Sequence, residues 1–178
     1  MDGDCTMSQI NVNTIANASG TSALTVDSTG RILTPARPAF RAFLSSNTGN
    51  VDYTSAAASD FVFESESYDI GGNYNTGNGK FTAPIAGLYH FNASMYGTGF
   101  GSGVTWASVY IFVNGVVRSR TINDPEGGAY AFPQITDNLQ LTAGQEVTIR
   151  LGVAGDSTVN MSGEADGSTT NFSGFLIG

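Results

Sequence analysis

Short runs of alternating apolar and polar residues recur along the chain from Ala39 onward. In the run EVTIRLGVA, residues 146–154, every second side chain is aliphatic and those between are mostly polar. A period of two is that of a β-strand with one face buried and the other in water. The connections between runs are rich in Gly, Asn and Ser, as in a β-sandwich. The expected strands are residues 39–45, 61–69, 80–85, 88–97, 106–120 with a reversal at 114–115, 137–143, 146–154 and 171–177.

Asn114-Gly115 supplies the strongest hairpin signal in the sequence. A two-residue hairpin turn requires a positive φ at both central positions, and Asn-Gly tolerates this best. We therefore expect the chain to reverse there. The one-sided pattern of residues 146–154 places that strand in an outer sheet with a solvated face.

The last strand, NFSGFLI at residues 171–177, is apolar on both faces. Phe172 and Leu176 share one face, and Phe175 and Ile177 share the other. A strand of this kind belongs in the middle of a sheet, with the core on one side and a further cover on the other. A second copy of the chain is the simplest cover.

The strand around LYHFNASMY is expected to lie beside this cover. One of its faces is apolar, whereas the other carries His90, Asn92, Ser94 and Tyr96 and is polar but almost uncharged. Faces of that kind suit contact with another subunit. The predicted self-association residues are His90, Asn92, Tyr96, Phe175 and Ile177.

The first 37 residues differ from the rest. Apolar residues flank the turn Asp27-Ser28-Thr29-Gly30, which predicts a short hairpin, but a lone hairpin is marginal in water and needs a partner surface. Pro35 and Pro38 then interrupt the chain. We expect an extension over residues 1–37 and a domain over residues 38–178.

The charge balance excludes several classes of partner. The chain has 15 acidic against 7 basic residues, a formal net charge of −8, and no basic cluster. Nucleic acid and anionic lipid surfaces require clustered Lys and Arg, so neither is an expected partner. The sequence also shows no apolar run of membrane-spanning length and no signal-peptide pattern. We expect synthesis in the cytoplasm, or export by another route.

Candidate chemistry is sparse, and no catalytic constellation is found. His90 is the only histidine and Cys5 the only cysteine, which leaves no triad or zinc set. The loop acids Asp156, Glu164 and Asp166 are candidate calcium ligands, although solvated carboxylates are the alternative. The Gly-rich loop 97–103 lacks the lysine and helix of a phosphate loop.

Two aromatic residues flank this Gly-rich loop. Phe100 and Trp106 are candidates for a surface that binds a sugar or a partner, with packing in the core as the alternative. The expectation for the whole chain is a binding or structural protein rather than an enzyme, with no cofactor.

The order of these patterns resembles the head domain of the C1q and tumour-necrosis-factor-like superfamily. The motifs that carry the resemblance are Tyr68, Asn73-Tyr74, Gly79-Lys80-Phe81-Thr82, Pro84, Gly87-Leu88-Tyr89-His90-Phe91, Leu139 and Leu141 before Gly144, and Phe172-Ser173-Gly174-Phe175-Leu176. The resemblance covers residues 38–178. It implies a ten-strand jelly-roll sandwich that forms a homotrimer around its inner sheet, with the last strand in that sheet. Calcium is bound by some members.

The leader SQINVNTIANASGTSALTVDSTGRIL resembles a segment found at the start of virion proteins of marine phages. It implies attachment of residues 7–37 to other virion proteins, in a capsid, tail or fibre. The expected function is that of a phage structural protein, located on the virion, whose trimeric head decorates the particle or adheres to a host-surface glycan. The alternative is a bacterial secreted or surface-displayed module that binds carbohydrate or protein.

Overall fold

The computed structural model describes residues 11–52, 59–100, 103–124, 130–131, 133–155 and 158–178. These residues are all strands, turns and connections, with no helix among them. The chain divides into two compact units, Met1–Arg37 and Pro38–Gly178. Within the described part, the structure contains no apolar helix long enough to span a membrane.

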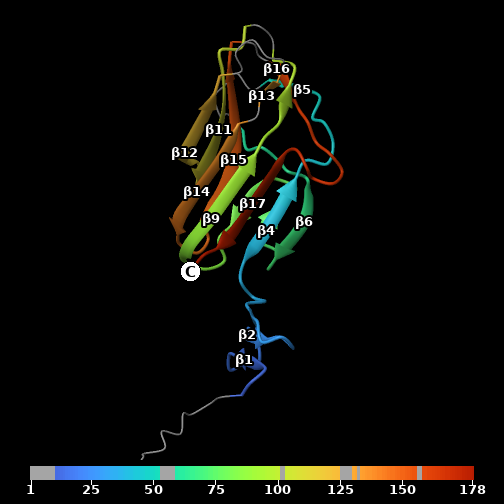
Figure 1. The fold of residues 1–178 in the computed structure, drawn as a ribbon. Coiled ribbons are helices and arrows are strands. Elements are labelled where there is room, and N and C mark those ends of the chain that lie inside the picture. Colours follow the sequence, from blue (N-terminus) through green and yellow to red (C-terminus); the bar gives the residue numbers. More distant parts are fainter. Residues whose placement is uncertain (1–10, 53–58, 101–102, 125–129, 132, 156–157) are drawn as a thin grey trace, which may run out of the picture. The chain divides into compact units, whose positions relative to one another are not determined.

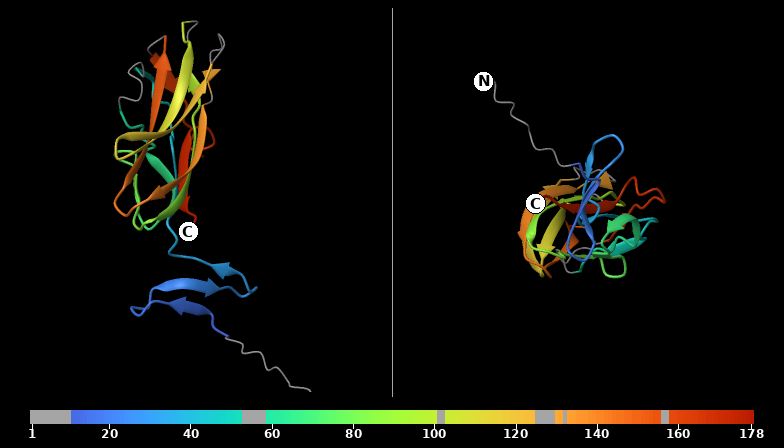
Figure 2. Two further views of the ribbon diagram at one scale, coloured as in Figure 1. Left: turned by 90° about the vertical axis from the view of Figure 1, so that its left-hand side faces the viewer. Right: turned by 90° about the horizontal axis from the view of Figure 1, so that it is seen from below.

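The unit Pro38–Gly178 is built on two five-stranded antiparallel sheets (Figures 1 and 2). We call the sheet with order β14-β9-β17-β4-β6 the C-terminal-strand sheet and the one with order β12-β11-β15-β8-β7 the opposite sheet. The first comprises β4 (Ala39–Phe43), β6 (Ser65–Ile70), β9 (Gly87–Ser94), β14 (Gln134–Leu141) and β17 (Asn171–Leu176). The second comprises β7 (Tyr74–Asn75), β8 (Lys80–Thr82), β11 (Trp106–Val113), β12 (Val116–Asn123) and β15 (Glu146–Ala154).

A smaller four-stranded sheet, β13-β10-β16-β5, closes one end of this sandwich (Figure 1). Its strands are β5 (Asn50–Asp52), β10 (Gly97–Thr98), β13 (Tyr130–Ala131) and β16 (Thr158–Met161). The sequence did not predict this sheet, because strands of two to four residues show no readable alternation.

The core between the two large sheets is dominated by aromatic rings. Phe40 of β4 stacks on Phe81 of β8 at 4.9 Å between ring centroids and on Tyr74 of β7 at 5.0 Å. Phe172 of β17 meets Phe40 edge-on at 4.9 Å. Rings from the two sheets therefore interlock, and offset or edge-on aromatic pairs add to the free energy gained from burial.

The expected central position of the last strand in its sheet is confirmed. β17 lies in the middle of its sheet and pairs with β9 on one side and β4 on the other. Phe172 and Leu176 are buried in the core, while Phe175 and Ile177 lie on the exposed side. The turn at Asn114-Gly115 is also confirmed, with φ values of +49° and +75° joining β11 to β12.

The expectation of a solvated face on residues 146–154 is wrong at Thr148. This side chain is only 5% exposed. Its hydroxyl donates to the Asp60 carboxylate over 2.9 Å, and the Phe61 backbone N–H donates to the Ile149 carbonyl over 2.7 Å. The segment before β6 thus lies along β15, and residues 61–63 do not join the strand that was expected to start there.

The unit Met1–Arg37 contains a three-stranded sheet, β1-β2-β3, formed by β1 (Thr14–Ala16), β2 (Ser22–Val26) and β3 (Ile32–Leu33). The predicted hairpin is β2–β3, with Val26 paired to Ile32. The Asp27 carboxylate closes its turn by accepting from the Thr29 and Arg31 backbone N–H groups over 2.8 and 3.0 Å. The remaining strand of this sheet, β1, lies in a stretch where apolar and polar residues alternate only weakly.

Candidate functional site

The candidate site is the outward face of the C-terminal-strand sheet, the side turned away from the aromatic core. β9 shows how this face arises, because its side chains alternate strictly between buried and half-buried positions. The buried set packs on the core, and the half-buried set, which includes His90 and Asn92, forms part of the outward face.

The strand register aligns a row of side chains across this face, three of them apolar. Residues paired directly on neighbouring strands project to the same side of a sheet. The row runs through Asn138 of β14, His90 of β9, Phe175 of β17, Ala39 of β4 and Ile70 of β6. We call it the interface row.

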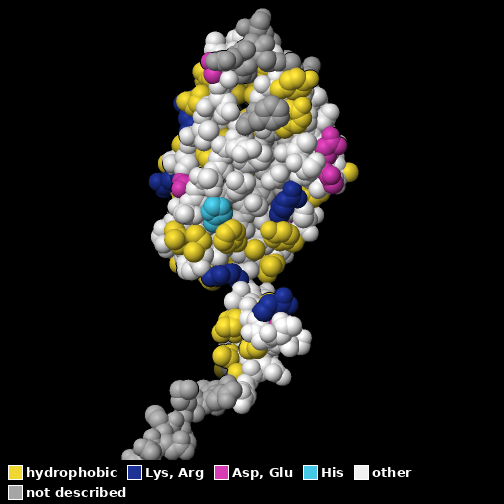
Figure 3. Space-filling model, in the orientation of Figure 1, with side chains coloured by type: hydrophobic (Ala, Val, Ile, Leu, Met, Phe, Trp, Pro, Cys, Tyr) yellow, Lys and Arg dark blue, Asp and Glu magenta, His cyan; other side chains and the backbone are white. Residues whose placement is uncertain are grey.

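Contacts within the interface row fix its side chains. The His90 Nδ1 and the Asn138 Oδ1 lie 2.8 Å apart, and the imidazole packs against the Phe175 ring with centroids separated by 5.1 Å. Phe175 nevertheless remains 46% exposed. Figure 3 shows hydrophobic side chains gathered on both sides of the single histidine on this face. The row is therefore ordered but uncovered.

The next row along the strands is polar. It consists of Thr136, Asn92, Ser173, Arg41 and Tyr68. Arg41 is held within the domain, since its Nη1 donates to the Ser67 hydroxyl over 2.8 Å and its Nη2 donates to the Gly167 carbonyl over 2.6 Å. Its guanidinium also lies 5.9 Å from the centre of the Phe43 ring. This row presents hydrogen-bonding groups beside the interface row.

The other predicted self-association residues take different places. Ile177 follows β17 and is 38% exposed, with its backbone N–H donating to the Leu88 carbonyl over 2.7 Å. Tyr96 lies beyond the end of β9, where its ring stacks on Tyr130 at 6.1 Å. The structure thus brings His90, Asn92, Phe175 and Ile177 onto one surface and places Tyr96 beside the small four-stranded sheet.

Sequence reasoning missed three members of the interface row, Asn138, Ala39 and Ile70. Asn138 and Ala39 lie on predicted strands and Ile70 lies one residue beyond a predicted strand, but alternation alone does not give the pairing that sets these residues in one row with Phe175. The signal available for Ala39 was its position in the alternation of β4, which is opposite to that of the core residues Phe40 and Ala42.

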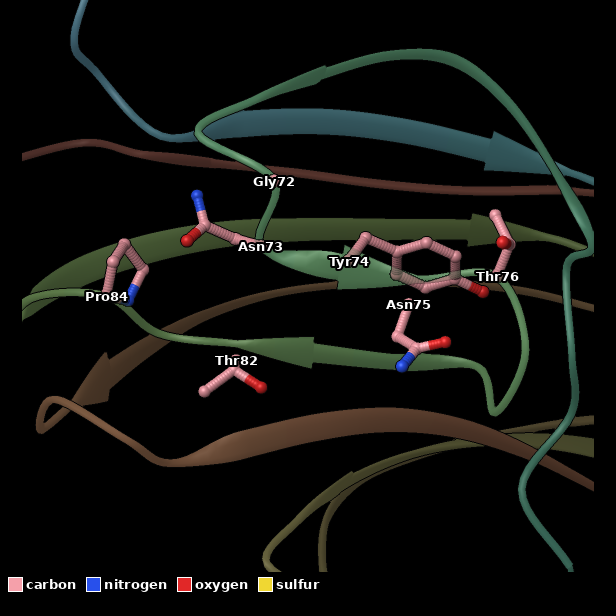
Figure 4. A pocket seen from close by; sticks show the side chains of 7 residues that line it. All are labelled: Gly72, Asn73, Tyr74, Asn75, Thr76, Thr82 and Pro84. Atoms are coloured by element: carbon pink, nitrogen blue, oxygen red, sulfur yellow. The ribbon is translucent and has the colours of Figure 1, made fainter.

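A hollow of about 540 Å³ lies beside β7 and β8 in the opposite sheet. Figure 4 shows its lining side chains, which offer amides, hydroxyls and a proline ring but no charge. The lining residues are Gly72, Asn73, Tyr74, Asn75, Thr76, Thr82 and Pro84. We call this the polar hollow.

Two amides of the polar hollow are held in place by the backbone. The Asn73 Nδ2 donates to the Ile70 carbonyl over 3.1 Å, and the Asn75 Oδ1 accepts from the Gly77 N–H over 2.8 Å. Tyr74 is buried behind them, and its hydroxyl donates to the Phe63 carbonyl over 3.2 Å. Burial raises the pKa of Tyr74 above its ordinary value. Neutral, preoriented hydrogen-bonding groups of this kind suit a neutral polar ligand.

The two aromatic candidates are separated by the fold. Phe100 is buried in the core cluster, which is the packing alternative left open by the sequence. Trp106 begins β11 and is half-buried, with the Arg120 guanidinium 4.9 Å from its ring centre. Only Trp106 is thus available to a ligand.

The candidate calcium ligands form no visible set. Asp156 lies outside the described residues, and Glu164 and Asp166 are exposed in the connection before β17. Hydrogen bonds from the Ser168 hydroxyl and backbone lower the pKa of Asp166 below its ordinary value. Among the described residues, no three His, Cys, Asp or Glu side chains converge as a metal ion would require.

Comparison with known proteins bears on the whole unit Pro38–Gly178. The profile of the C1q domain family matches residues 40–177. The globular domain of zebrafish complement 1qA is similar in structure, with a TM-score of 0.61 and 18% identity over 79% of this chain and 98% of that one. Murine APRIL gives a TM-score of 0.58 with 10% identity over 79% and 99% of the two chains.

The two structural likenesses show a shared jelly-roll fold, and the profile match spans nearly the whole of the unit that carries the candidate site. The arrangement of two five-stranded sheets, with the last strand in the middle of one, agrees with that fold. The chain therefore belongs to the C1q domain family.

Proposed function

We propose that this protein is a non-enzymatic structural component of a phage virion, in which three heads of residues 38–178 assemble through the C-terminal-strand sheet. One observation carries the proposal. The central strand β17 and the residue after it place Phe175 and Ile177 on the side away from the core, 46% and 38% exposed. A neighbouring copy that covers them would remove this apolar surface from water, and full burial of a side chain of this size gains about 1.5–3 kcal/mol.

The interface row suits contact with identical copies. It combines apolar side chains with His90, whose Nδ1 lies 2.8 Å from the Asn138 Oδ1 and whose Nε2 lies 3.4 Å from the Thr136 hydroxyl. The row therefore carries few unsatisfied polar groups into an interface. The trimeric assembly of C1q and tumour-necrosis-factor-like domains supports three copies as the number. A closed threefold arrangement leaves no apolar face free for further growth.

The mass of the full chain in native buffer tests the assembly. We expect a complex of three chains that remains intact on dilution into the low micromolar range. A monomer at those concentrations, or a closed dimer, would contradict the proposed interface.

The virion role rests on the resemblance of the leader to virion proteins. We propose that residues 7–37 attach the trimer to other virion proteins. Electron microscopy of particles labelled with an antibody against residues 38–178 tests this. Label at a regular position on the capsid, tail or fibre is expected, and particles that carry none would exclude the role.

For the outward activity we propose adhesion to a host-surface glycan through the polar hollow. Its uncharged amides and hydroxyls match the hydroxyl groups of a sugar. In a glycan-array assay, Thr82→Arg would fill the hollow and is expected to abolish binding. The matched control, Thr142→Arg, places the same charge on an exposed turn elsewhere and should bind as the wild type does. Equal binding by both variants would remove the polar hollow from consideration.

A secreted or surface-displayed bacterial binding module is the second candidate. The family match favours it as well, because the match covers the head alone and is independent of the leader. Detection of the chain on bacterial surfaces rather than on particles distinguishes this candidate from a virion protein.

A further inference from the structure

The sheet β1-β2-β3 gathers its aliphatic side chains on one face. Ile15 is paired with Leu24, and Val26 is paired with Ile32. Paired residues share a side, and so do Leu24 and Val26, which are two positions apart on β2. All four side chains therefore project from the same face, which we call the leader face.

Among the described residues of its own unit, none covers the leader face. Ile32 is 67% exposed and Ile15 is 53% exposed. Figure 3 shows the hydrophobic side chains of this unit gathered on one side. The other side of the sheet carries Thr14, Thr25 and the exception, Leu33.

A sheet this small requires a second layer. Its strands are three, five and two residues long. Isolated sheets of that size are at best marginally stable in water unless an apolar face packs on something else. The described part of the unit Met1–Arg37 contains no other strand that could serve as this layer.

Chain connectivity indicates which molecule supplies the cover. The head begins at Pro38, whose carbonyl accepts from the Leu176 N–H over 3.0 Å, and the next residue, Ala39, is paired with Phe175. The leader is therefore joined to the head at the interface row itself. If three heads meet at that row, three leaders start beside one another.

The tether between sheet and head is short. Residues 34–37 separate β3 from Pro38, and four residues span at most about 14 Å. Short tethers hold linked segments at effective concentrations in the millimolar range. The four side chains that define the leader face are uncharged, and the Asp27 and Arg31 side chains in the adjoining turn pair with each other at 2.6 Å. Three identical faces can thus meet without repulsion.

We propose that the leader faces of three copies pack against one another, so that Ile15, Leu24, Val26 and Ile32 form a small aliphatic core shared by the trimer. The proposal rests on the proposed trimeric assembly of the heads. In this arrangement the other two copies cover the leader face. Attachment to the virion then uses the remaining surfaces of residues 7–37.

Site-specific cross-linking of the full chain tests this. In a Cys5→Ser background, which removes the one native thiol, Leu24→Cys places a thiol on the leader face and Thr25→Cys places one on the opposite side. Treatment with a short bis-maleimide is expected to convert most of the Leu24→Cys protein to covalent dimers, and at least fivefold less of the Thr25→Cys protein. Ile32→Cys provides a second thiol on the leader face and should behave as Leu24→Cys does.

Native mass, measured on the same variants, separates this proposal from the proposed function. Three chains with no preferential cross-linking at Leu24 and Ile32 would overturn the shared core and leave the head trimer standing. A single chain would overturn both. Leader-face thiols that form no covalent dimer in the isolated trimer but cross-link to another virion protein in intact particles would show that a virion protein is the cover, and would also overturn the proposal.

Discussion

The head and the leader use the same alternation of apolar and polar residues but reach opposite outcomes. In the head, β4 and β17 place Phe40 and Phe172 against rings from the opposite sheet, and both side chains are completely buried. In the leader, β1–β3 align Ile15 and Ile32 just as regularly, and both remain mostly exposed. The difference is the presence of a second layer, since an apolar face gains free energy only when another surface removes it from water.

The same contrast recurs within the C-terminal-strand sheet. Its inward face is covered by the opposite sheet, whereas its outward face holds the uncovered interface row. Alternation in a sequence therefore shows which side chains share a face. Whether that face is covered by the same chain or by another copy depends on how many layers the chain itself supplies.

Removal of a core ring should give the largest effect and sharpen the comparison. Phe172→Ala deletes the ring that meets Phe40 and packs 5.8 Å from Phe63. We expect the free energy of unfolding of the head to fall by about 3–5 kcal/mol. Chemical denaturation followed by tryptophan fluorescence measures it, since Trp106, the only tryptophan, lies in the head.

The matched change in the leader is Leu24→Ala. We expect it to alter the unfolding free energy of the head by no more than about 0.5 kcal/mol, because Leu24 belongs to the separate unit Met1–Arg37 and is not a member of the head core. An equal loss for the two variants would break the comparison, because head and leader would then unfold as one cooperative unit.

Much of the fold was predictable from local pattern. Strands of five or more residues with a clear period of two were found, and the two-sided apolarity of residues 171–177 correctly placed β17 in the middle of a sheet. The burial of Thr148 was not predictable, because its cover comes from Asp60, 88 residues away in the chain. Long-range cover of this kind leaves no trace in the alternation of the covered strand.

The candidate site was predictable in its faces but not in its register. Parity places His90 and Phe175 on outward faces, yet only the pairing of β9 with β17 sets them opposite each other. Parity also groups Tyr96 with His90, and Tyr96 is half-buried as His90 is, but it lies two residues beyond the end of β9 and its ring stacks on Tyr130 of the small sheet. Phe100 is buried because Gly97 has no side chain, and a Cβ there would lie 2.7 Å from the Phe100 ring.

Removal of the uncovered apolar residues of β17 should have the next largest effect. The double variant Phe175→Ser and Ile177→Ser is expected to weaken assembly by about 1–3 kcal/mol per chain, since roughly two-fifths of each side chain remains to be buried. Sedimentation velocity over a range of concentrations should show monomers at concentrations where the wild type is trimeric.

The control for this variant uses another exposed aliphatic pair of the head. Val116→Ser with Val117→Ser changes side chains on β12, in the opposite sheet, that are exposed to a similar degree. This variant should assemble as the wild type does. If the Val116 and Val117 variant dissociates and the Phe175 and Ile177 variant does not, the interface lies on the opposite sheet.

The smallest effect concerns the turn that holds β2 to β3, and it arises from pH. Backbone donation from Arg31, with the Thr29 hydroxyl and the Arg31 side chain, stabilises the ionised Asp27 carboxylate and lowers its pKa below the ordinary value. A group whose pKa is depressed by folding stabilises the folded form fully above the unfolded-state pKa of about 3.9, and this contribution is lost as the pH falls through the folded-state value. The Asp27 side chain is half-buried in a surface turn, so solvent partly screens the effect and the change should be confined to the leader.

Amide hydrogen exchange at Thr29 and Arg31 measures the state of this turn as the pH is lowered from about 6 to about 2. We expect protection, corrected for intrinsic exchange, to fall in the acid range while the amides of β9 and β17 in the head keep theirs. Asp27→Asn retains an acceptor for both N–H groups but does not titrate, so its protection at these two amides should not change with pH. A parallel loss in both proteins would contradict this prediction, because a group other than the Asp27 carboxylate would then be the one that titrates.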